Sequence, residues 1–203
     1  MKILFCKISS MKYYKGVRKN FDEPRNGGSF VIENGYGHEE HNFNPTVIDG
    51  EEYCLGFVET KTTSAQKQNE LHIEKISGCE LLKKDECVDD VLVVWCATEI
   101  NNVTSVVGWY KHATVYRNYC FEELEDREQY FNIIAKKEDC TLIPFYKRNW
   151  HGWCAPVAKV RKFGFGQSMI WYASEEKAQN YINQLCKYID EYDGENAMDE
   201  IID

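Results

Sequence analysis

Strand-like sequence patterns fill the chain up to residue 173, and only the stretch after it has the period of an α-helix. The clearest strand is Val91–Ala97, which is apolar on both faces and is therefore expected at the centre of a sheet. Ser105–Arg117 follows after a polar turn, and it is long enough to span two sheets or to bend at Gly108. Six further strands are predicted, at Lys2–Ile8, Ser29–Glu33, Tyr53–Thr60, Leu71–Ile76, Tyr130–Ala135 and Cys140–Ile143.

The last regular element is a predicted helix that Ser174 caps and that ends near Gly194. Its apolar residues recur at helical spacing along one face: Ala178, Tyr181, Ile182, Leu185, Cys186 and Ile189. We therefore predict an α+β protein, with a mostly antiparallel curved sheet or small β-barrel braced by a C-terminal helix. Residues 1–194 are expected to form a single domain, and 195–203 a short, acidic, frayed tail.

Length and cysteine usage favour a folded protein of the cytoplasm. The chain has 203 residues and no apolar run near the ~20 residues of a transmembrane helix. A charge already stands at Lys7, too early for the apolar stretch of a signal peptide. The nine cysteines are odd in number and include no C-x-x-C pair, which favours buried, reduced thiols over disulfides or zinc. No cofactor is expected.

Signatures of catalysis are scarce. The sequence contains no G-x-S-x-G elbow and no phosphate-binding G-x-x-x-x-G-K-[ST] loop. The segment His38-Glu39-Glu40-His41 spaces its histidines by three in a Gly/Asn-rich loop, which favours a polar loop over a metal site. A nucleophile–base pair could be drawn from Cys96, Cys154, His112 and His151, but chance supplies such pairs in any chain with nine Cys and five His. We therefore expect no enzyme.

The net charge of −9 is unevenly distributed along the chain. Residues 1–30 and 136–172 each carry seven Lys/Arg against two Asp/Glu, whereas 31–135 and the last thirty residues are acidic. The two basic segments also contain the aromatic residues Tyr13, Tyr14, Trp150, Trp153, Trp171 and Tyr172. If they meet in space, they form a basic, aromatic patch on an acidic body, a feature typical of nucleic-acid binding. Scattered positive charges on solvated faces are the alternative.

Large aromatic residues also stand beside small ones in an unusual density. Trp95 ends the central strand, Trp109 and Tyr110 follow Gly108, and the Gly-hinged loop Phe163–Tyr172 presents Gln167, Ser168 and Trp171. Such a set can form a cage in which flat rings sandwich a planar group and polar groups bond its edge. A simple core role for these aromatic residues is the alternative.

The segments Asp90–Ala97 and Ser105–Tyr116 resemble the central hairpin of the PUA-like superfamily, in particular its EVE and YTH branches. In those families the end of the first strand and the start of the second border a pocket for a flipped, modified base. By position, the resemblance implies that Trp95, Cys96, Ala97 and Trp109 border such a pocket. The sequence departs from the family pattern in its Gly/Asn-rich segment 22–50 and in the Phe163–Tyr172 loop.

The function predicted from this resemblance is non-catalytic recognition of a modified or flipped base in nucleic acid, with modified DNA favoured over RNA and without membrane contact. Such modules serve in modification-dependent restriction or phage defence, where a partner protein supplies the nuclease. Stacking is assigned to Trp95, Trp109 and Trp171, edge hydrogen bonds to Gln167 and Ser168, and phosphate contacts to Lys12, Lys15, Arg18, Arg161 and Lys162. The alternatives are an acidic protein-interaction module that binds no nucleic acid, and an enzyme with a Cys/His pair.

Overall fold

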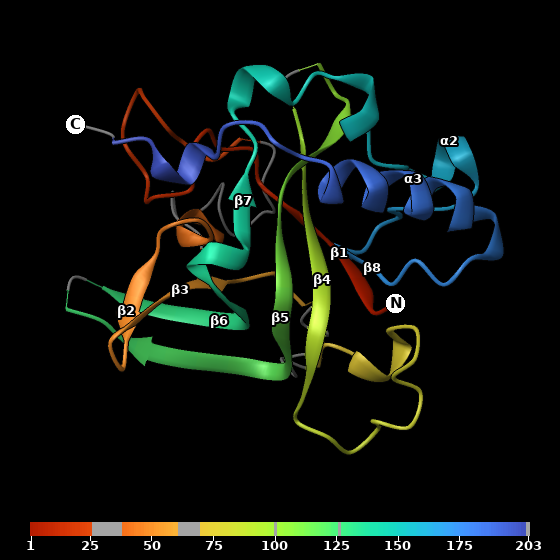
Figure 1. The fold of residues 1–203 in the computed structure, drawn as a ribbon, viewed down its shortest axis with the longest axis horizontal. Helices are drawn as coiled ribbons and strands as arrows, with labels where there is room; N and C mark the ends of the chain where they lie inside the picture. The colour runs from red at the N-terminus through yellow and green to blue at the C-terminus, as the bar shows by residue number, and fades with distance from the viewer. Residues whose placement is uncertain (26–37, 61–69, 100, 126, 202–203) are drawn as a thin grey trace.

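The computed structural model describes residues 1–25, 38–60, 70–99, 101–125 and 127–201, and the predicted strand Ser29–Glu33 lies outside them. The described strands form one mixed, mostly antiparallel sheet (Figure 1). They are β1 (Ile3–Ile8), β2 (Thr46–Ile48), β3 (Glu51–Gly56), β4 (Cys87–Thr98), β5 (Thr104–Glu123), β6 (Glu128–Lys136), β7 (Cys140–Leu142) and β8 (Ile170–Trp171). The α-helices are α2 (Ala158–Arg161) and α3 (Gln179–Asp190). The predicted α+β class is confirmed.

The sheet has the strand order β2-β3-β6-β5-β4-β1-β8, and β7 pairs with β5 outside this path. It is open rather than closed into a barrel, so the curved-sheet form of the prediction applies. Its centre includes β4, as the doubly apolar pattern predicted. The pairing of β1 with β4 is parallel, from Ile3 opposite Leu92 to Ile8 opposite Ala97. The carboxyl ends of these two strands therefore meet at one edge of the molecule.

Both faces of the central strands are buried. Alternation along β1 and β4 sends Leu4 and Val93 into one apolar cluster and Phe5 and Val94 into the other. The second cluster is covered by α3 through the buried residues Ile182, Leu185 and Ile189. The predicted apolar helix face is thus confirmed. The predicted cap at Ser174 is wrong, because the 3₁₀ turn η6 (Glu176–Ala178) leads into the helix and starts from Glu175.

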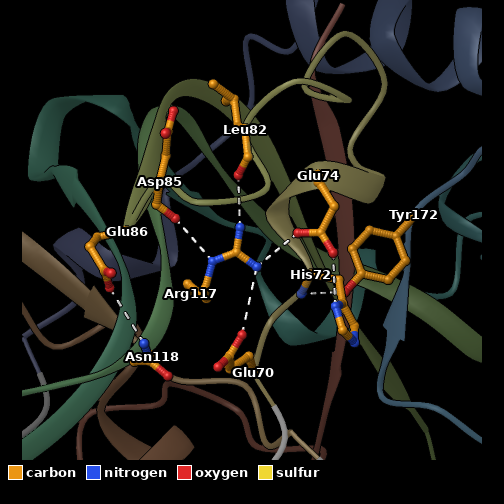
Figure 2. A network of polar contacts seen from close by, with 9 residues as sticks. All are labelled: Glu70, His72, Glu74, Leu82, Asp85, Glu86, Arg117, Asn118 and Tyr172. Carbon is orange, nitrogen blue, oxygen red and sulfur yellow. Dashed lines mark hydrogen bonds and ion pairs between the residues drawn. The ribbon is translucent and has the colours of Figure 1, made fainter.

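The predicted strand Leu71–Ile76 is instead an irregular segment with a 3₁₀ turn, η2 (Ile73–Lys75). Its conformation is fixed by Arg117 of β5, whose side chain donates to the carbonyls of Asp85 and Leu82 and to the Glu74 carboxylate (Figure 2). Burial alone would raise the pKa of Glu74, but hydrogen bonds from Arg117, the Glu74 backbone and His72 lower it to about 2. This network anchors residues 70–86 on the sheet.

The expectation of a frayed tail is wrong for residues 196–199. Asn196 accepts hydrogen bonds from the backbone N–H groups of Leu142 and Met198 and donates to the Cys140 carbonyl. The turn that follows, η7 (Ala197–Asp199), buries both Ala197 and Met198. Packing therefore continues past the predicted domain boundary at residue 194.

The nine cysteines are free thiols, and five of them are buried: Cys6, Cys54, Cys79, Cys96 and Cys140. In the described ranges, His, Cys, Asp and Glu side chains do not gather in a group of three or more that could hold a metal ion. None of the helices in these ranges is both long and apolar enough to cross a membrane.

Candidate functional site

The predicted aromatic cage is contradicted by the strand register. Val94 pairs with Trp109 and Trp95 pairs with Gly108, so the two tryptophans project from opposite faces of the sheet. Trp95 packs against Tyr110 in the first apolar cluster, and Trp109 packs against Trp153 and Tyr192 near the second. One planar ligand cannot lie between them.

The other predicted base-binding residues divide between core and surface. Trp171 is buried against Phe5, with ring centroids 4.5 Å apart, and its indole N–H donates to Glu175. Cys96, Ala97 and Tyr110 are fully buried. Gln167 and Ser168 are exposed, and the Ser168 hydroxyl accepts a hydrogen bond from the backbone of Ile170. None of these residues lines the grooves or the pocket described below.

The five predicted phosphate contacts do not converge. Arg161 and Lys162 end the short helix α2, at the opposite side of the molecule from the N-terminal segment 10–25 (Figure 1). Lys15 donates to the carbonyls of Met198 and Glu200 and borders, with Arg18, a groove beside the C-terminal segment. Of the five, Lys12 alone lines the pocket described next.

The two basic segments do contact each other, but through Arg148 rather than through the predicted phosphate-binding residues. Its guanidinium, with 1% of the residue exposed, donates to the carbonyls of Met11, Lys12 and Ile143 at 2.6–2.9 Å. It also lies over the rings of Tyr14 and Phe145. Burial lowers the pKa of Arg148, although the nearby groups of Tyr14, Glu99 and Asp22 act to raise it. This one side chain fastens residues 143–148 to residues 11–14.

The N-terminal segment is held in a defined loop by further polar contacts. The Asp22 carboxylate accepts hydrogen bonds from the backbone N–H groups of Lys12 and Tyr13 at 2.6 and 2.8 Å. Ser10 and Arg25 exchange two backbone hydrogen bonds. Tyr14, fully buried, has a φ of 54°, a conformation that a bulky residue adopts only when its surroundings enforce it. The loop is therefore preorganised.

The loop and the Arg148 segment enclose a pocket of about 130 Å³, here called the Phe21–Phe145 pocket. Its full lining comprises Ser10, Met11, Lys12, Phe21, Asp22, Glu23, Arg25 and Phe145. The two phenylalanines are exposed by 53% and 37%, and Tyr13 stacks behind Phe21 with ring planes 14° apart. The Lys12 ammonium lies over both of these stacked rings. The pocket thus combines exposed aromatic surface with two cations, Lys12 and Arg25, and two acids, Asp22 and Glu23.

A buried polar network supports the floor of this pocket, at the carboxyl ends of β1 and β4. Ser10 donates at 2.7 Å to one oxygen of Glu99, and the other oxygen lies 3.7 Å from Arg148. Ser9 donates from its backbone and its hydroxyl to the buried Glu39 carboxylate. Burial raises the pKa of Glu39, although the hydrogen bonds from Ser9 oppose this effect. Carboxyl ends of parallel strands are a common place for ligand sites.

The larger grooves are less suited to a specific ligand. One of about 610 Å³ beside the C-terminal segment is lined by charges that already pair, Lys136 with Glu51 at 2.8 Å and Lys137 with Glu52 at 2.9 Å. It offers no aromatic wall. The Phe21–Phe145 pocket is therefore the better candidate.

Sequence reasoning identified the two basic, aromatic segments but missed the residues that join them. Phe21, Phe145, Arg148 and Glu99 carry no motif, and their roles depend on contacts across 40 to 140 residues of chain. The basic and aromatic composition of 1–30 and 136–172 was the one available signal.

Comparisons with known proteins give no match: no family model, no curated protein and no solved structure is significantly similar to this chain.

Proposed function

We propose that this protein is a non-catalytic nucleic-acid-binding module that holds one unpaired or extruded base in the Phe21–Phe145 pocket. The observation that carries the proposal is the pocket itself, where two exposed aromatic rings stand beside Lys12 and Arg25. Bases of every type stack on aromatic side chains, and cations at the pocket rim bind the phosphates. A pocket of this size suits a single planar ring.

The surface next to the pocket extends the same chemistry. The 3₁₀ turn η4 (Phe145–Lys147) carries Tyr146, exposed by 66%, and Trp150 follows it, exposed by 42%. Lys147 lies between them in the sequence and pairs with Glu195. Exposed aromatic side chains of this kind can stack further bases of a single strand. Because the net charge is −9, we expect attraction to be local and affinity to be modest.

The proposal extends to the role that the PUA-like resemblance implies. The bound base is then a modified one, and the protein is the recognition part of a restriction or phage-defence system whose nuclease is a separate partner. The acidic interaction module remains the second candidate, and its supporting observation is the acidic balance of the chain.

The test is fluorescence anisotropy with labelled single strands and duplexes over a range of salt concentrations. Phe21→Ala and Phe145→Ala should each weaken binding by roughly 5- to 150-fold, the value of one base stacked on an aromatic ring. Lys12→Ala should reduce the salt slope by roughly 0.7, as for one phosphate contact to a single strand. Phe121→Ala, which removes a 46% exposed phenylalanine from β5, is the matched control and should bind like the wild type. Absence of salt-dependent binding to every strand would favour the interaction module.

A further inference from the structure

The polar groups at the floor of the Phe21–Phe145 pocket offer a ligand more hydrogen-bond acceptors than donors. The loop's own hydrogen bonds already use the backbone N–H groups of Ser10, Lys12, Tyr13, Phe21, Asp22 and Arg25. These groups donate to the Asp22 carboxylate and to carbonyls of the same loop. None of them is left to meet an acceptor on a ligand.

The hydroxyl of Ser10 is also committed as a donor. It lies 2.7 Å from Glu99 Oε2, and an ionised carboxylate has no hydrogen to give, so the serine supplies the proton of this bond. Arg148, 3.7 Å from the other oxygen, forms a buried salt bridge with Glu99. The lone pairs of Ser10 Oγ are the part of the hydroxyl that remains for a ligand.

Two further acceptors lie at or behind the floor. The Asp22 carboxylate lines the pocket and can only accept. Glu99 Oε1, in a side chain 6% exposed, accepts no hydrogen bond from the described part of the chain. Glu99 itself does not line the pocket, so Ser10 and Asp22 are the acceptors that a ligand meets there.

We infer that the pocket selects a base with an exocyclic amino group, such as cytosine or adenine, over the equivalent ring with a carbonyl group. The amino group would donate to Ser10 Oγ at the floor, while Lys12 and Arg25 at the rim face the phosphates. A carbonyl oxygen placed against Ser10 Oγ meets a lone pair rather than a proton and loses its hydrogen bond to water. This inference rests on the proposed function and names the ligand class of the same site.

The experiment compares bases of the same ring shape in which a carbonyl replaces the amino group and the neighbouring ring nitrogen gains a hydrogen. Short thymidine oligonucleotides carry a single central dC or dU, or a single central dA or deoxyinosine, and binding is measured by fluorescence anisotropy. We expect dC to bind at least about fivefold more tightly than dU, and dA than deoxyinosine, the effect of one hydrogen bond made or lost.

Two variants test the assignment to Ser10 and its orientation by Glu99. Ser10→Ala removes the acceptor, and Glu99→Gln supplies an amide donor that frees the serine proton, so each should abolish the preference for the amino group. Ser168→Ala, at an exposed serine of the loop before β8, is the control and should keep it. A wild-type circular dichroism spectrum and thermal unfolding midpoint show that a variant is folded.

The outcomes separate the two proposals. Salt-dependent binding with equal affinity for dC and dU, or with tighter binding of dU, overturns the inference and leaves the proposed function standing. Retention of the preference in Ser10→Ala also overturns it. Failure of every oligonucleotide to bind removes the proposed function itself.

Discussion

Arg148 is the residue whose replacement should be most informative about the site's architecture. It is buried and donates to the carbonyl of Ile143 in its own segment and to the carbonyls of Met11 and Lys12 in the N-terminal loop. It also lies 3.7 Å from the buried Glu99 carboxylate. Arg148→Met keeps much of the side-chain volume but removes every one of these donors. Hydrogen bonds to a charged group contribute about 1.5–3 kcal/mol each, but they are not additive. Breaking a buried ion pair costs about 3–5 kcal/mol, and we expect a loss in this range.

The assay is urea denaturation followed by circular dichroism and tryptophan fluorescence. Arg161→Met, at an exposed position in α2, is the matched control and should change the free energy of unfolding by less than about 0.5 kcal/mol. The double variant Arg148→Met/Glu99→Gln should recover part of the loss, because it removes the buried carboxylate that the single variant leaves without its cationic partner. A loss below about 1 kcal/mol in Arg148→Met would refute the view that this side chain joins the two segments.

Three further predictions concern stability. Trp95→Ala should cost about 3–5 kcal/mol as a core substitution, whereas Gln167→Ala should stay within about 0.5 kcal/mol; equal effects in urea denaturation would contradict the burial difference. The pKa of Glu74 is lowered to about 2, so its stabilisation is complete above its usual value near 4.5 and is lost as pH falls toward 2. Glu74→Gln should flatten this acid limb of the stability–pH curve, and an unchanged limb would refute the role of its contact with Arg117. Asn196→Ala should lower stability by about 1–3 kcal/mol, because it leaves buried backbone groups without partners; wild-type thermal stability would show that the C-terminal segment is dispensable.

The elements that could be predicted from the sequence are those set by local patterns. The doubly apolar Val91–Ala97 segment required a place inside the sheet, and the spacing of Ile182, Leu185 and Ile189 required a helix that covers one face. The segment Leu71–Ile76 was misjudged because its buried residues Leu71, Ile73 and Ile76 fit a 3₁₀ turn as well as a strand.

The candidate site could not be predicted in the same way, because it depends on register and on long-range contacts. A strand's pattern shows that its side chains alternate, but only the pairing of Val94 with Trp109 shows that Trp95 and Trp109 face apart. Nothing in the local sequence indicates that Arg148 donates to the carbonyls of Met11 and Lys12. Trp95 and Trp109, which stand near small residues, are core, whereas the exposed pocket uses Phe21 and Phe145 from the two basic segments.

The proposal that nucleic acid binds at the Phe21–Phe145 pocket is tested most directly by locating the bound strand on the protein. A two-dimensional NMR titration of the ¹⁵N-labelled protein with a short single strand reports which backbone amides sense the ligand. We predict that the perturbed amides cluster at residues 10–25 and 143–150, around the Phe21–Phe145 pocket. Perturbations confined to the Phe163–Tyr172 loop and α2, or spread evenly over the surface, would contradict it.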